Sequence, residues 1–146
     1  MIITFFGHAS FFATEDDENL LMQAFESIIG EKDADFYLGG YGGFDAFACR
    51  CAKKYKALHK KSKLYFITPY ISENYYKKDI YASDADFSGV IYPPIEKTPP
   101  RFAISKRNDW MVRECDIVFT RMRHTYGRSY QFIRLAERLN KRVVYI

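Results

Sequence analysis

Short apolar runs alternate with longer amphipathic runs along this 146-residue chain, and that alternation limits the fold more than any other feature. The short runs predict buried strands at residues 2–6, 35–38, 64–68, 90–92, 116–120 and 143–146. Apolar side chains at helical spacing predict helices at residues 18–29, 44–58, 102–115 and 129–139. Strands that alternate with helices are typical of a parallel sheet covered on both faces. We therefore expect an α/β fold, a single Rossmann-like domain over residues 1–146 with three layers (α/β/α) and a mostly parallel sheet of five to six strands.

A parallel sheet brings the loops that follow its strands to one edge. In such sheets ligands bind at the carboxyl ends of the strands, where the winding reverses. Gly7 and His8 follow the first predicted strand, residues 39–43 follow the second, and residues 121–128 follow the fifth. We expect these loops to converge, and Gly7 and His8 to be among the ligand-binding residues.

Four glycines occupy five positions of the second loop, in the stretch YLGGYGGFDAFA; they are Gly39, Gly40, Gly42 and Gly43. Glycine lets a ligand approach the main chain closely, and the amino end of a helix offers N–H groups to a phosphate. The GGYGG spacing matches neither the dinucleotide fingerprint nor the phosphate loop of NTPases. The glycines thus predict a phosphate- or nucleotide-binding turn, or else a tight strand-to-helix turn that serves packing alone.

Asp45 falls in the first turn of the helix that follows these glycines. A carboxylate there interacts favourably with the positive end of the helix dipole, by about 0.3–1 kcal/mol, and that role alone would explain it. A carboxylate repels phosphate, whereas it accepts hydrogen bonds from hydroxyl groups. If a ligand binds, Asp45 is therefore our candidate for contact with its ribose.

The charge of the chain is uneven, although its net value is only +4. Residues 101–146 carry +7 and the preceding hundred −3, and nine of the ten arginines lie in the former segment. Gly127, Arg128 and Ser129 open the last predicted helix and form a second candidate phosphate site. The alternatives are a solvated basic loop in which Ser129 only caps the helix, and a nucleic-acid-binding surface whose affinity would fall steeply with salt.

Three stretches resemble short Rossmann-like proteins of the SLOG superfamily, namely GGYGGFDAFA, FAISKRNDWMVRECDIVFT and HTYGRSYQFIRLAERLNKRV. That superfamily joins the DNA-processing protein A family to the Lonely-guy phosphoribohydrolases, which activate cytokinins. The resemblance covers nearly the whole chain in the order of its elements, and it implies a nucleotide-like ligand at the edge described above. Its most specific parts are GGYGGFD and the pair Arg107 and Asn108.

Lonely-guy enzymes hold the phosphate of a nucleoside monophosphate with the motif PGGxGTxxE, whose Glu acts at the ribose during cleavage of the N-glycosidic bond. This chain keeps three of the motif's glycines, but it has Leu38, Gly43 and Ala46 in place of the Pro, Thr and Glu. Asp45 precedes the position of the Glu by one residue, about 100° around the helix. The resemblance also implies that Arg107 contacts a phosphate or a base.

We therefore expect a protein of SLOG type that binds a nucleotide or nucleoside phosphate. A version with hydrolase activity would cleave an N-glycosidic bond, with Asp45 and Arg107 as the catalytic residues and Asn108 beside the ligand. The alternatives are a non-enzymatic nucleic-acid-binding module and a ligand-sensing subunit of a larger assembly.

The remaining candidates each have two interpretations. His8 and His124 are suited to acid–base chemistry near neutral pH, or are ordinary loop histidines. Cys49 and Cys51 are two positions apart on a predicted helix and so point away from each other, which indicates buried structural thiols. We accordingly expect neither a metal nor a cofactor.

A tyrosine-rich stretch separates the third and fourth predicted strands. It would form either a lid that stacks on a base or a packed surface loop, and its tyrosines are Tyr70, Tyr75, Tyr76 and Tyr81. The sequence has no basic, apolar leader and no apolar stretch of about 20 residues, which predicts a cytoplasmic protein without a membrane partner. A homo-oligomer is compatible with the sequence.

Overall fold

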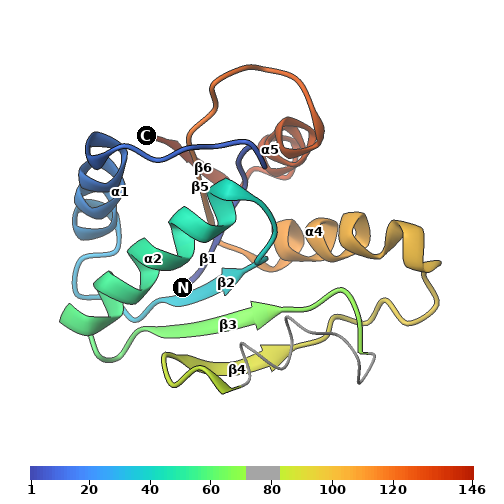
Figure 1. Cartoon of the computed structure of the whole chain (residues 1–146), viewed down its shortest axis with the longest axis horizontal. Coiled ribbons are helices and arrows are strands. Elements are labelled where there is room, and N and C mark those ends of the chain that lie inside the picture. Colours follow the sequence, from blue (N-terminus) through green and yellow to red (C-terminus); the bar gives the residue numbers. More distant parts are fainter. Residues whose placement is uncertain (72–82) are drawn as a thin grey trace.

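A computed structural model describes residues 1–71 and 83–146 as one parallel sheet with helices on both faces (Figure 1). The elements in chain order are β1 (Ile2–Phe5), α1 (Glu15–Ile28), β2 (Asp35–Leu38), α2 (Gly43–Leu58), β3 (Lys63–Ile67), β4 (Phe87–Ile91), the 3-10 helix η1 (Pro100–Phe102), α4 (Ala103–Glu114), β5 (Ile117–Thr120), α5 (Arg128–Arg138) and β6 (Arg142–Tyr145).

The six strands lie in the order β4-β3-β2-β1-β5-β6, and every neighbouring pair is parallel. Strands β2, β3 and β4 extend the sheet on one side of β1, and β5 and β6 extend it on the other side. The winding therefore reverses between β1 and β5, where Thr4 pairs with Val118. The predicted Rossmann-like α/β/α fold is confirmed, and the sheet is parallel throughout its described strands.

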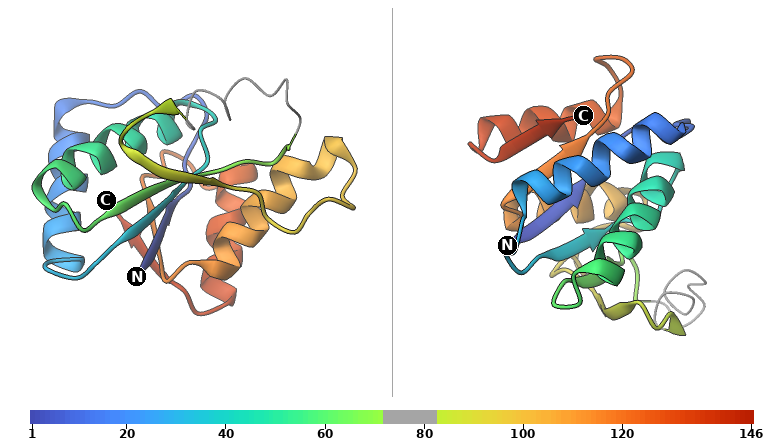
Figure 2. Two further views of the ribbon diagram at one scale, coloured as in Figure 1. Left: turned by 90° about the horizontal axis from the view of Figure 1, so that it is seen from below. Right: turned by 90° about the vertical axis from the view of Figure 1, so that its left-hand side faces the viewer.

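Side chains of the central strands alternate between two apolar cores. Ile3 and Phe5 of β1 pack beneath α1 and α2, whereas Phe6 and Val118 pack beneath α4 and α5. Figure 2 shows the two helix pairs on opposite sides of the sheet. This period of two explains why the strand segments read as continuous apolar runs, since both of their faces are buried.

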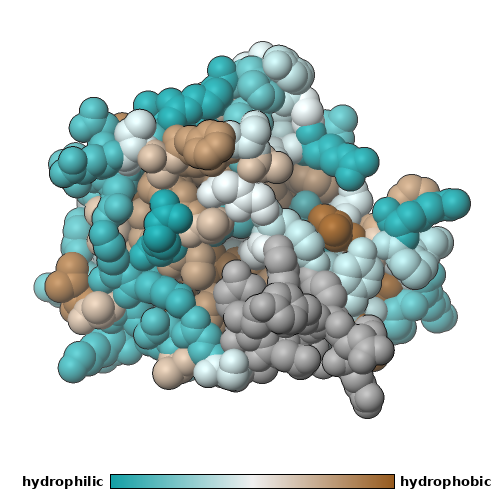
Figure 3. Space-filling model, in the orientation of Figure 1, coloured by the Kyte–Doolittle hydropathy of each residue, from teal (hydrophilic) through white to brown (hydrophobic). Residues whose placement is uncertain are grey.

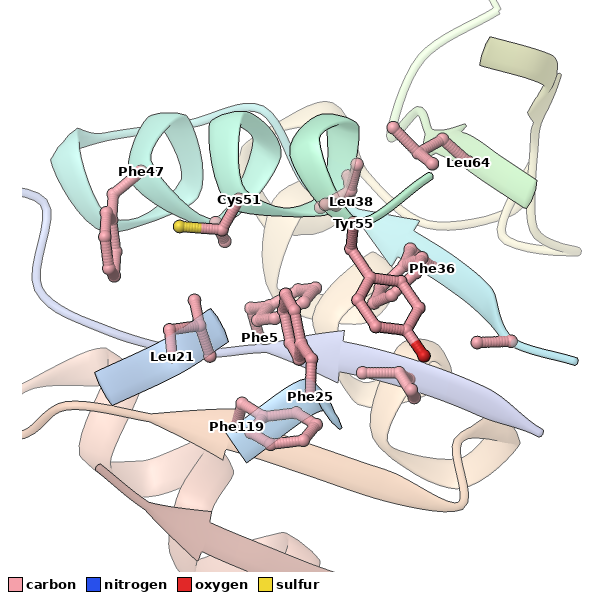
Figure 4. Packing of buried hydrophobic residues seen from close by; sticks show 14 of the residues in the cluster. Phe5, Leu21, Phe25, Phe36, Leu38, Phe47, Cys51, Tyr55, Leu64 and Phe119 are labelled. Atoms are coloured by element: carbon pink, nitrogen blue, oxygen red, sulfur yellow. The ribbon is translucent and has the colours of Figure 1, made fainter. Parts of the chain in front are cut away.

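Aromatic rings fill much of the core beneath α1 and α2 (Figure 4). The ring of Phe25 lies edge-on to the rings of Phe5, Tyr55 and Phe119, with centroids 5.2–6.0 Å apart. The Phe5 ring is in turn stacked on that of Phe36 at 6.1 Å. Edge-to-face and offset pairs add about 0.5–1.5 kcal/mol beyond area burial. Ten of the thirteen phenylalanines are buried, so the high phenylalanine content of the chain is largely a property of its core.

Most predicted elements begin and end within a few residues of the observed ones. The first helix starts at Glu15 and not at residue 18, because Thr14 caps it through a reciprocal capping box with Asp17. Strand β4 starts at Phe87, three residues before the predicted strand. The prediction missed these residues because Ser88 and Gly89 have low strand propensity. The predicted helix at residues 102–115 corresponds to α4, which connects β4 to β5 and is directly preceded by the 3-10 helix η1.

None of the helices in the described ranges is long and apolar enough to cross a membrane. On the face shown in Figure 3, apolar side chains are interspersed with hydrophilic ones.

Candidate functional site

A small cavity of about 90 Å³ lies at the carboxyl edge of the sheet. Its wall is formed by the end of β1, the loops after β1 and β2, the first turns of α2 and α5, and the helix α4. Six of the residues predicted to form a site line it, namely Gly7, Gly39, Asp45, Arg107, Asn108 and Ser129. The other lining residues were not predicted, and they are Phe5, Phe6, Ala9, Tyr41, Ile104 and Met111.

The cavity lies where the winding of the sheet reverses. Ser129, in the first turn of α5, donates a hydrogen bond of 2.6 Å from its Oγ to the carbonyl oxygen of Gly7. This bond joins the loop after β1 to the start of α5, the helix that follows β5, and β1 and β5 are neighbouring strands. The expected convergence of the loops is therefore present, and Ser129 bonds to the main chain of another loop instead of capping its own helix.

The amino end of α2 is occupied by the protein itself. The N–H of Gly43 donates to the carbonyl oxygen of Ala9 over 2.8 Å, and the N–H of Phe44 donates to that of His8 over 3.3 Å. Figure 1 shows the first loop, in blue, passing over the start of α2. Of the two interpretations of the glycines, phosphate binding does not hold for the amide of Gly43, because the carbonyl oxygen of Ala9 takes the place of the anion.

The close approach of the first loop also explains two of the glycines. A Cβ on Gly43 would lie 2.1 Å from the carbonyl oxygen of Phe11, and one on Gly42 would lie 2.7 Å from the Cα of Ala9. Gly42 also has a φ of +89°, which disfavours any residue with a side chain. Packing of loop on helix is thus the reason for these two glycines, whereas Gly39 faces the cavity.

The amino end of α5 is different. Within residues 1–71 and 83–146, no acceptor lies within hydrogen-bonding distance of the N–H groups of Arg128, Ser129 and Tyr130. Gly127 caps the helix with a φ of +96° and leaves open space around its Cα. The Arg128 side chain is exposed, and within those same ranges it makes no ion pair. An anion is favoured at such a helix start.

The loop before α5 is held by a buried carboxylate. Asp17 is 1% exposed and forms ion pairs of 3.0 Å with both Arg121 and Arg123. Burial raises the pKa of this carboxyl, but hydrogen bonds with Thr14 and the two guanidinium charges outweigh burial and leave the pKa below its usual range. Two arginines of the basic loop therefore have structural partners, whereas Arg128 has no ion-pair partner among residues 1–71 and 83–146.

Arg107 is the largest fully buried side chain among the described residues, with 1% of its surface exposed. Its Nη1 donates to the carbonyl oxygens of Gly39 and Ile67, at the carboxyl ends of β2 and β3, over 2.8 and 2.7 Å. Its Nε donates to Oδ1 of Asn108, and its guanidinium lies 5.4 Å from the centre of the Tyr41 ring. Arg107 thus joins α4 to two strand ends and forms a buried cationic wall of the cavity.

Asp45 serves the loop that precedes its helix. Its Oδ2 accepts a hydrogen bond of 2.7 Å from the N–H of Tyr41. The same oxygen and the Nη2 of Arg107 each lie 3.3 Å from the position of a Cβ on Gly39, so any side chain there would crowd both charged groups. Asp45 and Arg107 therefore flank the Gly39 backbone at the cavity.

His8 and His124 stack on each other at the edge of the site. Their ring centroids are 3.6 Å apart and their planes differ by 23°. Nε2 of His8 accepts the N–H of Arg123, so the His8 proton lies on Nδ1. Burial lowers the pKa of His8, and the neighbouring His124 and Arg123 charges lower it further. A main-chain hydrogen bond at His124 raises the pKa, but the net shift is downward. Neither ring lines the cavity.

The remaining predicted residues fall outside the cavity. Gly40 lies in the turn before α2 with a φ of +74°. Cys51 is buried as expected, whereas Cys49 is half-buried. Burial raises the pKa of Cys49 to about 11 and that of Cys51 to about 12, so both thiols stay protonated near neutral pH. No group of potential metal ligands occurs in the described part of the chain.

Of the predicted tyrosine lid, Tyr75, Tyr76 and Tyr81 lie outside the described residues.

One missed feature had a signal in the sequence. Ala103, Arg107 and Met111 are spaced four apart, so the arginine shares the inward face of its helix with two apolar residues. An arginine on a buried face requires acceptors, and the ends of β2 and β3 supply them. Tyr41 and the stacked histidines had no such signal, because their partners come from distant segments.

No protein-family model matches the chain, and no curated protein matches it in sequence.

Proposed function

We propose that the protein binds a nucleotide or nucleoside phosphate, as expected for a protein of SLOG type. The observation that carries the proposal is the convergence of Gly39, Asp45, Arg107 and Asn108 on one cavity whose rim includes the start of α5. Hydrogen-bonding groups and a site for an anion thus lie side by side, as a sugar phosphate requires.

We assign the phosphate to the start of α5. The first amides of α2 are taken by carbonyl oxygens, whereas no protein acceptor reaches those of Arg128, Ser129 and Tyr130 within the described ranges. The exposed guanidinium of Arg128 adds a positive charge suited to bidentate binding of phosphate. This assignment moves the phosphate away from the glycine-rich loop that the Lonely-guy motif would use.

We assign the ribose to the cavity itself. The carboxylate of Asp45 and the amide of Asn108 are suited to accept hydrogen bonds from hydroxyl groups. The cavity of about 90 Å³ is small beside the roughly 300–1,000 Å³ of pockets that enclose whole ligands. It therefore suits one group of the ligand, with the base and the phosphate lying at its rim.

The test is a thermal-shift screen with ribonucleoside monophosphates and diphosphates, ribose 5-phosphate and inorganic phosphate. A ligand at 100 times its Kd stabilises the folded state by about 2.7 kcal/mol, which is readily measured. We expect stabilisation by the sugar phosphates and less by phosphate alone. An absence of any shift at millimolar concentrations would exclude the proposed function.

Asp45→Asn tests the ribose assignment. Asn keeps a hydrogen-bonding side chain but loses one acceptor oxygen and the charge, so ribose phosphates should lose affinity while inorganic phosphate does not. Asp16→Asn is the matched control, because Asp16 occupies the first turn of α1 and is exposed. Equal losses for ribose phosphate and inorganic phosphate would refute the assignment.

Cleavage of an N-glycosidic bond is the second candidate function. The carboxylate of Asp45 at the cavity favours it, because a carboxylate there would stabilise positive charge that develops on the ribose. Release of free base from ribonucleoside monophosphates, followed by chromatography, tests it directly. Turnover by the wild type that Asp45→Asn leaves intact would exclude Asp45 as the catalytic residue.

Nucleic-acid binding is distinguished by its salt dependence. Contacts to several backbone phosphates make affinity fall steeply as salt rises, whereas a single phosphate in a cavity is affected far less. Two arginines of the basic loop, Arg121 and Arg123, are already paired with Asp17. We therefore expect weak binding of oligonucleotides that disappears at moderate salt.

A further inference from the structure

Three aromatic rings form a column beside the start of α5. The rings of His8 and His124 are stacked at 3.6 Å, and the ring of Tyr126 is stacked on His124 at 3.8 Å with planes 17° apart. His8 is buried, whereas Tyr126 is 69% exposed. The column therefore runs from the interior outward and ends in a tyrosine ring of which only one face is covered by His124.

The inner end of this column is firmly held. Nε2 of His8 accepts the N–H of Arg123, and the Arg123 side chain is paired with the buried Asp17. The Nδ1 of His124 lies 3.2 Å from the carbonyl oxygen of Tyr126. The Tyr126 ring itself is ordered by its stacking on His124, so it loses less side-chain entropy when a further ring stacks on it than an isolated exposed tyrosine would.

We propose that the outer face of Tyr126 is the stacking site for a nucleobase or a similar heteroaromatic ring of the ligand. The inference rests on the proposed function. Tyr126 directly precedes Gly127, which caps α5, so the ring platform adjoins the amides assigned to the phosphate. Ser129 of the same turn lines the cavity assigned to the ribose. The positions assigned to base and phosphate thus lie in one short segment, and Ser129 of that segment borders the position assigned to the sugar.

An aromatic platform determines which ligands bind best. Stacking on an aromatic side chain tolerates different bases, because every base has a π face. A nucleoside monophosphate should therefore bind more tightly than ribose 5-phosphate, which lacks the base, and the four bases should differ little among themselves. Discrimination between bases would require hydrogen bonds to their edges, which the ring of Tyr126 does not supply.

The experiment compares two ligands on four forms of the protein by titration calorimetry. The ligands are ribose 5-phosphate and the tightest binder among the four ribonucleoside monophosphates. The proteins are the wild type, Tyr126→Ala, Tyr126→Phe and the control Leu58→Ala, which removes another exposed apolar side chain, at the carboxyl end of α2. Tyr126→Ala should weaken the monophosphate at least about five-fold and leave ribose 5-phosphate unchanged. The other two variants should bind as the wild type does.

Proton NMR of the bound monophosphate gives a second readout. Stacking on Tyr126 should shift the base protons upfield in the wild type and in Tyr126→Phe, and Tyr126→Ala should abolish that shift.

Four results would overturn the inference. If Tyr126→Ala weakens both ligands equally, the side chain acts only by holding the loop; if it weakens neither, no base stacks there. If the wild type binds both ligands equally, the base makes no favourable contact, and the proposed function stands without this inference. If the wild type binds neither ligand, the proposed function and the inference fail together.

Discussion

Arg107 is buried together with its charge, and its hydrogen bonds connect three elements at the cavity. Removing such a side chain leaves the carbonyl oxygens of Gly39 and Ile67 without their donor. A buried acceptor without a partner destabilises a fold by about 1–3 kcal/mol. Arg107 is therefore a structural requirement of the site, whether or not it also contacts a ligand.

Arg107→Met should lower the free energy of unfolding by about 2 kcal/mol or more, because two carbonyl oxygens lose their hydrogen bonds. Urea unfolding followed by circular dichroism measures the change. Arg113→Met is the control on the same helix, since Arg113 is 54% exposed and pairs only with Asp109 one turn away. Exposed pairs of this kind contribute little. Similar stability of the two variants would contradict the role of Arg107.

His8 makes stability depend on pH. Its pKa in the folded state is lowered, so the unfolded chain binds a proton more readily below about pH 6.5. The free energy of unfolding should therefore fall as the pH drops from about 6.5 toward the folded pKa. In His8→Gln, which keeps an acceptor for the N–H of Arg123, this part of the pH dependence should vanish. Urea unfolding at pH 5, 6 and 7 is the measurement, and parallel pH profiles for both proteins would refute the claim.

The start of α2 shows how an element can serve packing where its sequence indicates ligand binding. Glycines and a following helix are the local signal for a phosphate site, and the strand, turn and helix that the sequence predicts here are observed. The partners of the amides are carbonyl oxygens of His8 and Ala9, more than thirty residues earlier. No local pattern distinguishes an amide that meets a phosphate from one that meets another loop.

Gly43→Ala tests this account of the α2 start. Helix propensity alone predicts that alanine stabilises the helix by up to about 1 kcal/mol. The structure predicts the opposite, since the added Cβ would lie 2.1 Å from the carbonyl oxygen of Phe11 and the backbone would have to move. Thermal unfolding should show a lower Tm for Gly43→Ala than for the wild type.

Gly127→Ala is the comparison for that prediction. Its Cβ would meet no atom within 4 Å, so only the backbone conformation, with a φ of +96° and a ψ of 178°, opposes the change, by about 1–3 kcal/mol. Gly43→Ala should therefore be the more destabilising of the two. A Tm at or above that of the wild type for Gly43→Ala would show that the first loop does not press on the helix.

The order of strands and helices was predictable over residues 1–71 and 83–146 because each element carries its own period of apolar residues. The candidate site was predictable only in part. Its backbone turns follow from the parallel topology, whereas the pairing of Asp17 with Arg123 joins residues 106 positions apart and that of His8 with Arg123 joins residues 115 apart. Such pairs depend on the packing of complete elements, which no short segment specifies.

The two apolar cores lie on opposite faces of one sheet and should unfold together. Every central strand contributes alternate side chains to both, so neither core survives once the sheet separates. Trp110, the single tryptophan, packs on Tyr37 beneath α4 and reports one face, while circular dichroism reports all helices. Their urea transitions should coincide, as in two-state unfolding of small domains. A tryptophan transition at clearly lower urea would mean that α4 and α5 detach first, and the cavity between α4 and the strand ends would then open before the sheet does.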